Sequence, residues 1–344
     1  MNNLNNNKEK ADIRVKFIGF QSGDHINGIR LNKTWLYKVL DKNYNIVECE
    51  DADYVICSCF SLYEYCGTKQ VRIMYSGENY VPDFNLVDYA ISSYPVDFFD
   101  RNFYLPASLF GYHEDRRFVE NRKNCFDKSI LNKKTGFANL IASYDSEGNY
   151  RSKVFDTLSQ YKKIDSPGKF RKNCECQVRF QDDSKVDFQK RYKFSLCIES
   201  AVNQGFNTEK IMDAFYAETV PIYYGDPEIA KIFNPKAFIN ISDFNSIEEA
   251  VSKIIEIDNN DELYLQMLNE PIFVDNNFIS KTFDNAEEFI KHIFEQPIDK
   301  AYRRSRVCWP KGHEEFLVKA TKTHKILYRN KVYTYIKEIY RKIK

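Results

Sequence analysis

Residues 192–227 have the pattern of an anion-binding site. A strand-like run at residues 194–198 is followed by a polar loop, and Thr208 then begins an amphipathic helix with Glu209 and Lys210 in its first turn. Threonine is a favourable N-cap residue, and the free N–H groups and positive dipole end of a helix attract phosphate. A lysine is unfavourable at the positive end of a helix dipole. A doubly charged diphosphate bound beside Lys210 would explain why a lysine occurs there. Neutralisation by Glu209 explains it equally well on spacing alone.

Glu78 is a candidate catalytic residue because of its position after a predicted strand. It follows the apolar run at residues 71–77 in a Ser-Gly-Glu turn, where Gly77 permits a sharp backbone bend. A carboxylate at the end of a strand in an α/β sheet can project toward a ligand and act as a general base. A single exposed glutamate is more often a solvated loop charge, so position alone leaves both interpretations of Glu78 open.

Three separated segments resemble the α-1,3/4-fucosyltransferases. They are MYSGENYVPDFNLVDYAI at residues 74–91, NYRSKVFDTLSQY at 149–161, and the stretch 192–227 with its continuation FNPKAFINISDF at 233–244. The segments occur in the order of the family and cover roughly residues 71–250. The resemblance implies GDP-fucose as the donor and a GT-B fold, in which two Rossmann-like α/β domains face each other across a cleft.

The resemblance also implies a role for each candidate residue. Glu78 corresponds to the general base, Arg151 to a ligand of the donor phosphates, and Glu209 to a contact with the donor's sugar that can stabilise positive charge on the ring. An arginine suits phosphate because its guanidinium binds two oxygens at once. The donor-binding residues that the resemblance implies are Ser143, Arg151, Ser195, Glu199, Ser200, Phe206, Thr208 and Lys210.

Several positions depart from the family pattern. Ser195, Ser200 and Phe206 stand where many members have Tyr, Asn and Tyr, and Tyr224 stands where they have Trp or a smaller residue. Each change removes or shrinks a contact with the donor, and one residue is inserted between Ser143 and Arg151. The identity of the donor among deoxysugar nucleotides is therefore less constrained than the reaction class.

The sequence supplies fixed positive charge for a leaving diphosphate. Such a leaving group is stabilised either by a divalent metal or by cations and helix N-termini. Arg151, Lys210 and the helix that begins at Thr208 provide the second arrangement. The Asp-x-Asp motif that clamps a metal in other sugar-nucleotide enzymes has no convincing counterpart, since Asp51-Ala52-Asp53 precedes a strand. We expect no metal or other cofactor requirement, and a single displacement implies inversion.

The predicted function is an inverting fucosyltransferase that moves L-fucose from GDP-fucose to a hydroxyl, by default O3, of GlcNAc in an N-acetyllactosamine-type surface glycan. One alternative is transfer of another deoxyhexose or hexose from a nucleotide, and another is a membrane-docked sugar-nucleotide binder without turnover. The joint presence of Glu78, Arg151, Glu209 and Lys210 favours an enzyme. The oligosaccharide acceptor should lie mainly on the first domain, whose loops carry Phe60, Tyr63, Tyr65, Tyr80, Tyr94, Phe98 and Phe99.

The pattern of apolar residues predicts two domains. Strand candidates alternate with helical stretches over residues 13–77, which indicates a mostly parallel sheet with helices on its faces, and a second α/β set begins near residue 135. Residues 114–134 are charged and lack apolar periodicity. We therefore expect an acceptor-binding domain at residues 1–125, a donor-binding domain at 126–300 and a basic helical tail at 301–344.

Charge is concentrated at the end of the chain. The net charge of +1 argues against a nucleic-acid binder, but residues 311–344 carry eight Lys, two Arg and three Glu. From residue 319 onward the apolar residues fall on one face of a helix, as in a basic amphipathic helix. Such a helix suits an anionic membrane surface. The alternative is a helix packed on the first domain with its lysines in solvent.

The cysteine pattern predicts a reducing compartment, and the first residues do not resemble a signal peptide. Nine cysteines form no regular framework, and the pairs 57/59 and 174/176 lack the Cys-x-x-Cys spacing of a zinc site. No apolar run reaches roughly 18 residues, and the first residues lack the apolar core of a signal peptide. We expect a cytoplasmic protein, peripheral on the inner face of the membrane.

Overall fold

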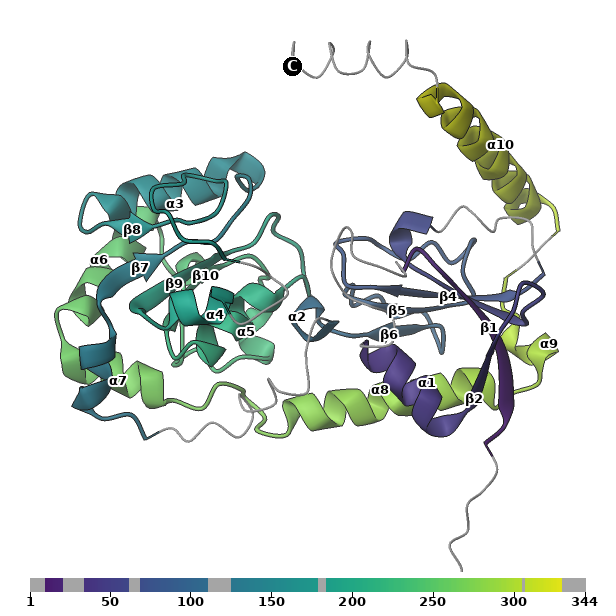
Figure 1. Cartoon of the computed structure of the whole chain (residues 1–344), viewed down its shortest axis with the longest axis horizontal. Helices are drawn as coiled ribbons and strands as arrows, with labels where there is room; N and C mark the ends of the chain where they lie inside the picture. The colour runs from purple at the N-terminus through teal and green to yellow at the C-terminus, as the bar shows by residue number, and fades with distance from the viewer. Residues whose placement is uncertain are drawn as a thin grey trace, which may run out of the picture.

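The computed structural model describes residues 10–20, 34–61, 69–110, 125–178, 184–304 and 307–329. These residues form two parallel β-sheets that lie side by side with helices packed on them (Figure 1). The first sheet has the order β2-β1-β3-β4-β5-β6 and the second the order β11-β10-β9-β7-β8. The prediction of an α/β fold with two Rossmann-like sheets is confirmed.

The first sheet consists of β1 (Asp12–Ile18), β2 (Asn45–Glu48), β3 (Tyr54–Cys57), β4 (Val71–Ser76), β5 (Tyr89–Ser92) and β6 (Asn102–Tyr104). The second consists of β7 (Gly136–Asn139), β8 (Ile164–Asp165), β9 (Tyr192–Ile198), β10 (Val220–Tyr224) and β11 (Ile239–Asn240). The helices are α1 (Trp35–Asn43), α2 (Ala107–Phe110), α3 (Tyr150–Ser159), α4 (Ser184–Gln189), α5 (Glu209–Tyr216), α6 (Ile247–Asp258), α7 (Asp261–Asn269), α8 (Phe278–Phe294), α9 (Ile298–Ala301) and α10 (Trp309–Arg329).

The two sheets share one strand order. Read in sequence order within each sheet, both begin 2-1-3-4-5, which is a common doubly wound arrangement. In the second sheet the order reverses between β7 and β9, and ligands of such sheets bind beyond the carboxyl ends of the strands at this point. We call the carboxyl ends of β7 and β9, with the loops that follow them, the β7/β9 edge. It contains most of the residues predicted to bind the donor.

The central strands of the first sheet are buried because both of their faces are covered. All residues of β3 and β4 are buried, as expected for parallel strands with helices on both sides of the sheet. Helix α6 begins at Ser246, whose hydroxyl accepts a hydrogen bond from the Glu249 backbone N–H at 3.2 Å, and Asn260 caps α7 in the same way. Local sequence therefore explains where these elements start and which surfaces they bury.

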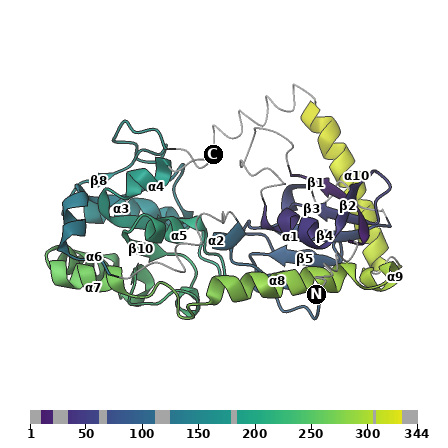
Figure 2. The ribbon, with the colours of Figure 1, turned by 60° about the horizontal axis from the view of Figure 1, so that its bottom comes forward.

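Helix α8 crosses from the second sheet to the first. Figures 1 and 2 show it running along the first sheet, and its rings pack there: Phe283 lies 5.3 Å from Trp35, and Phe294 lies 4.5 Å from Tyr54 between ring centroids. The range 126–300 therefore includes a helix that completes the core of the first sheet. Residues 111–124, which include part of the predicted boundary, lie outside the described residues.

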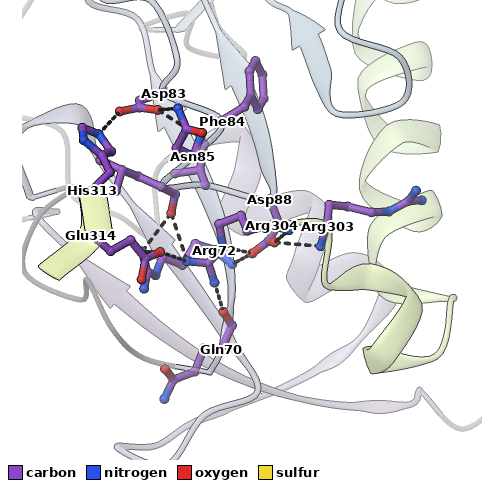
Figure 3. A network of polar contacts seen from close by, with 12 residues as sticks. Gln70, Arg72, Asp83, Phe84, Asn85, Asp88, Arg303, Arg304, His313 and Glu314 are labelled. Atoms are coloured by element: carbon purple, nitrogen blue, oxygen red, sulfur yellow. Dashed lines mark hydrogen bonds and ion pairs between the residues drawn. The ribbon is translucent and has the colours of Figure 1, made fainter. Parts of the chain in front are cut away.

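The start of α10 is tied to the first sheet by buried charges (Figure 3). The Glu314 carboxylate lies 3.2 Å from the Arg304 guanidinium and 3.4 Å from that of Arg72, and all three residues are buried. Asp88, which is fully buried, binds the Arg304 Nε at 2.9 Å. The tail therefore begins as a helix packed on the first domain.

Part of the predicted tail and part of the predicted acceptor surface fall beyond the described ranges. Residues 330–344, Tyr63 and Tyr65 lie outside the described residues. Within the described part of the chain, no helix is both long and apolar enough to span a membrane. The cysteines in that part are all free thiols.

Candidate functional site

Arg151 joins the two strands of the β7/β9 edge. It lies in the first turn of α3 and is only 3% exposed. Its Nε and Nη2 donate to the carbonyl oxygen of Ile198 at the end of β9, at 3.0 and 2.8 Å, and its Nη1 donates to the carbonyl oxygen of Tyr144 at 2.7 Å. These bonds use three of the five guanidinium N–H groups. Among the described residues, these bonds leave one N–H on each terminal nitrogen without a hydrogen-bond partner.

Glu199 organises the start of α5. Its side chain is buried, its Oε1 accepts from the Thr208 backbone N–H at 2.8 Å, and its Oε2 accepts from Lys210 Nζ at 2.9 Å. Thr208 is the N-cap residue by position, but its own hydroxyl bonds to Glu199 at 2.9 Å and does not cap the helix. Glu199, which directly follows β9, therefore fixes the N-cap residue of α5 and leaves the N–H groups of the first turn open. The direct ion pair of Lys210 is with Glu199, and not with Glu209 as the spacing allowed.

The charges at the start of α5 stabilise one another. Burial alone would lower the pKa of Lys210, but attraction to Glu199 and Glu209 raises it. Burial alone would raise the pKa of Glu209, but Lys210 and Lys185 lower it to about 2. Lys210 therefore stays positive and Glu209 stays negative at neutral pH, and 21% of the Lys210 side chain is exposed to meet a ligand.

Lys185 is a member of the site that the sequence did not reveal. It lies on α4, is 4% exposed, and its Nζ is 2.6 Å from Asp213 and 3.5 Å from Glu209. One signal was available: Glu209 and Asp213 are four residues apart on a predicted helix, so two carboxylates share one face and favour a nearby cation. The identity of that cation depends on how α4 packs against α5.

Phe206 lies in a loop that the first domain helps to hold. The ring is 5% exposed, and on either side of it the Gly205 N–H and the Asn207 Nδ2 donate to Asp226, at 2.8 and 2.9 Å. Asn207 also binds Ser108 of α2 twice, through its carbonyl oxygen at 2.7 Å and its side-chain oxygen at 2.8 Å. Phe206 is therefore fixed where the two domains meet.

The three predicted serines have different surroundings. Ser143 is exposed in the loop after β7, and Ser200 is half-buried in the loop after β9, so both lie at the β7/β9 edge. Ser195 lies inside β9 at 1% exposure, where its hydroxyl is 2.9 Å from both Asn139 Nδ2 and Thr219 Oγ1. The structure brings Ser143 and Ser200 to the site but places Ser195 within the sheet, away from the edge.

Glu78 lies on the other sheet. It is exposed at the carboxyl end of β4, with its carbonyl oxygen bound by the Ser93 hydroxyl at 2.7 Å and its N–H directed at Ser76 Oγ at 3.3 Å. Burial raises the pKa of the neighbouring Cys59, and the negative charge of Glu78 adds to that rise. These contacts fix the backbone of the turn and leave the Glu78 carboxylate exposed, where an acceptor hydroxyl can come within hydrogen-bond reach of it.

The arrangement suits an anion at the second sheet and a proton acceptor at the first. Lys210, Arg151 and the N-terminus of α5 gather positive charge at the β7/β9 edge, where a diphosphate can bind. Glu209 lies beside them as an ionised carboxylate. The described residues contain no group of three or more His, Cys, Asp or Glu arranged to hold a metal ion.

Family models match both halves of the chain. The model described as glycosyltransferase family 10 (fucosyltransferase) C-term matches residues 131–271, and the model described as alpha-(1,3)-fucosyltransferase FucT N-terminal domain matches residues 15–111. The first range includes Arg151, Glu199 and Lys210, and the second includes Glu78. The matched ranges therefore contain the candidate residues of both sheets.

Individual relatives agree with the family models. The chain is 31% identical over 271 residues to the alpha-(1,3)-fucosyltransferase FucT of Helicobacter pylori, over 68% of this chain and 55% of that protein. It is 37% identical over 79 residues to the 4-galactosyl-N-acetylglucosaminide 3-alpha-L-fucosyltransferase 9 of Mus musculus, over 22% of each chain. This chain thus spans little more than half of the Helicobacter protein and under a quarter of the mouse one.

A solved structure matches nearly the whole fold. The crystal structure of an alpha1,3-fucosyltransferase with GDP-fucose has a TM-score of 0.70 and 26% sequence identity, over 87% of this chain and 94% of that chain. This match confirms the GT-B arrangement of the two sheets. With both sheets and the candidate residues of each inside matched ranges, the chain belongs to glycosyltransferase family 10, the fucosyltransferases.

Proposed function

We propose that this protein is an inverting fucosyltransferase that uses GDP-fucose as its donor. The observation that carries the proposal is the group formed by Lys210, Arg151 and the N-terminus of α5 at the β7/β9 edge. The crystal structure with GDP-fucose described above supports the choice of donor, because it shares the fold. The departures at Ser200 and Phe206 keep a second donor, another nucleotide-linked deoxyhexose or hexose, as the alternative.

In the proposed mechanism the positive groups hold the diphosphate. Lys210 donates one hydrogen to Glu199 and one to Thr208 Oγ1, so its third hydrogen can bind a phosphate oxygen. Arg151 adds its two remaining N–H groups. As the bond between the anomeric carbon and the phosphate oxygen breaks, these cations stabilise the charge that develops on GDP. We propose on this basis that the reaction does not require a metal.

The acceptor hydroxyl attacks from the side of the first sheet. Glu78 takes its proton, the oxygen forms a bond to the anomeric carbon, and GDP leaves with the electron pair of the broken bond. Glu209 is placed to stabilise positive charge on the sugar ring. We propose O3 of GlcNAc in an N-acetyllactosamine-type oligosaccharide as the acceptor, in line with the name of the mouse relative.

The experiment that tests the proposal is GDP release from GDP-fucose with N-acetyllactosamine in the presence of EDTA. We expect the wild type to turn over, and Glu78→Gln to bind GDP-fucose normally but to lose a factor of about one hundred in kcat. Glu262→Gln serves as the control, because this glutamate is 81% exposed on α7. A wild type that binds GDP-fucose without turnover would instead identify a non-catalytic binder, and a donor panel separates fucose from other sugars.

The basic tail is proposed to bind an anionic membrane. Trp309 is 90% exposed and Phe316 is 66% exposed on α10, and the nearby Lys311, Lys319 and Lys322 are exposed as well. An aromatic and basic surface of this kind favours a layer of anionic lipid headgroups. The full chain should sediment with vesicles that contain phosphatidylglycerol and stay in solution with vesicles of phosphatidylcholine alone. Equal behaviour with both would contradict this part of the proposal.

A further inference from the structure

Lys185 approaches the proposed donor site from its buried side. Helices α4 and α5 pack together, and Lys185 Nζ lies between two carboxylates of α5, at 2.6 Å from Asp213 and 3.5 Å from Glu209. Lys185 and Asp213 are almost fully buried, whereas 39% of the Glu209 side chain is exposed. The lysine therefore contacts the inner side of Glu209, and the outer side of that carboxylate remains open to a ligand.

The two carboxylates need a cation between them. Glu209 and Asp213 are one helical turn apart, so their like charges repel, and a buried carboxylate such as Asp213 is unfavourable without a charged or hydrogen-bonded partner. The short contact with Asp213 fixes the ammonium group of Lys185. The ammonium group in turn attracts Glu209 and restricts the direction in which its carboxylate points.

The two lysines of this site have different partners. Lys210 forms its ion pair with Glu199, at 2.9 Å. Among the described residues, the ion pair of Glu209 is formed with Lys185. Both lysines attract Glu209, but the direct contact of its carboxylate is with Lys185, whereas the direct contact of Lys210 is with Glu199.

We propose that Lys185 is a positioning residue for the sugar of the donor: anchored by Asp213, it holds Glu209 in the orientation that contacts the fucose ring. This inference rests on the proposed function, in which Glu209 meets the sugar and Lys210 and Arg151 meet the phosphates. The proposed role of Lys185 predicts different effects on the binding of GDP-fucose and of GDP. Loss of Lys185 should weaken binding of GDP-fucose and leave binding of GDP unchanged, because GDP has no fucose ring.

The test compares two variants that treat the buried pair differently. Lys185→Met alone would remove the cation that contacts the buried Asp213 at 2.6 Å and could prevent folding. We therefore use the double variant Lys185→Met/Asp213→Leu, which replaces both charges by apolar side chains of similar shape. The matched control is Asp213→Asn, whose side-chain oxygen still accepts a hydrogen bond from Lys185 and so keeps the lysine beside Glu209. The dissociation constants of GDP and GDP-fucose are measured by calorimetry for both variants and the wild type, after circular dichroism has shown that they fold.

We expect the double variant to bind GDP-fucose about fivefold more weakly than the wild type, as for the loss of one partly exposed ion pair, with less than a twofold change for GDP. Asp213→Asn should keep the wild-type ratio of the two constants. The inference is overturned if both ligands weaken by the same factor, or if Asp213→Asn shifts the ratio as much as the double variant. A wild type that binds GDP-fucose but releases no GDP would contradict the proposed function while leaving this ratio measurable.

Discussion

Asp88 offers a sharp test of how the end of the chain is attached. Its carboxylate is fully buried and accepts four hydrogen bonds (Figure 3). Oδ1 accepts from the backbone N–H groups of Arg303 and Arg304, at 2.8 and 2.9 Å, and Oδ2 accepts from the Arg72 N–H at 2.7 Å and the Arg304 Nε at 2.9 Å. The residue thus joins two strands of the first sheet to the segment that leads into α10.

The substitution Asp88→Asn should be strongly destabilising although the side chain keeps its shape. One carboxylate oxygen becomes an NH₂ group, which is a donor and faces the two N–H donors that the oxygen had accepted. The Arg304 guanidinium also loses one of its two buried counter-charges, since Glu314 remains 3.2 Å away. Removing one partner of a buried ion pair costs about 3–5 kcal/mol. For a domain of this size, a loss of 1 kcal/mol lowers the melting temperature by roughly 2–4 °C. The melting temperature of the first thermal unfolding transition should therefore fall by roughly 6–20 °C.

The assay is thermal and guanidinium unfolding followed by circular dichroism, with Asp83→Asn as the control. Asp83 belongs to the same region but is 28% exposed, and its ion pair with His313 is long, at 3.5 Å. Its replacement should cost less than about 1 kcal/mol. A free energy of unfolding for Asp88→Asn within 1 kcal/mol of the wild type, or equal to that of Asp83→Asn, would refute the reasoning that this network anchors the C-terminal segment.

Other predictions concern the site. Lys210→Met should weaken the binding of GDP and of GDP-fucose alike, by about ten- to a hundredfold in calorimetry, because it removes a charged hydrogen bond to phosphate. It should also lower the melting temperature, because the buried Glu199 loses the cation that pairs with it. Phe60→Ala should raise the KM for the acceptor and not for the donor, because its ring is 70% exposed in the loop after β3, next to the strand that carries the proposed base. Phe99, although predicted for the acceptor surface, is 87% exposed just before the amino end of β6, at the opposite edge of the parallel sheet, so Phe99→Ala should change neither KM. The pKa of Glu209 is lowered from 4.5 to about 2, so its charge contributes stability that is present above pH 4.5 and is lost as the pH falls toward 2. Between pH 4.5 and pH 2, the guanidinium concentration at the midpoint of unfolding should therefore fall less for Glu209→Gln than for the wild type.

The positions that could be predicted from the sequence are those set by residues close together in the chain. The helix at Glu209 and Lys210 could be predicted because an amphipathic repeat follows Thr208, although the Thr208 hydroxyl does not itself cap the helix, and Glu78 follows a strand because a run of apolar residues ends before it. Such features depend on neighbours within a few residues. They suffice to predict two parallel sheets and the strand ends from which the candidate residues come.

The remaining features depend on contacts between distant parts of the chain. The pairing of Lys210 with Glu199 requires β9 and α5 to be adjacent, and Lys185 meets Glu209 only because α4 packs on α5. The burial of Ser195 within the sheet could not be predicted from pattern, because in a strand buried on both faces the alternation of side chains does not indicate which of them reach the surface. The contact between Asp88 and Arg304 spans 216 residues and carries no local signal.

The path of α8 has a consequence for the order in which the protein folds during synthesis. The strands of the first sheet leave the ribosome first, but Trp35 and Tyr54 stay without their partners on α8 until Phe278–Phe294 has been made. The second sheet and its helices are contiguous up to Asn269 and can complete their core earlier. We therefore expect the usual order, in which the N-terminal domain folds first, to be reversed. Until the final helices emerge, the nascent chain should carry a finished second domain and an open, apolar first sheet that needs protection from aggregation.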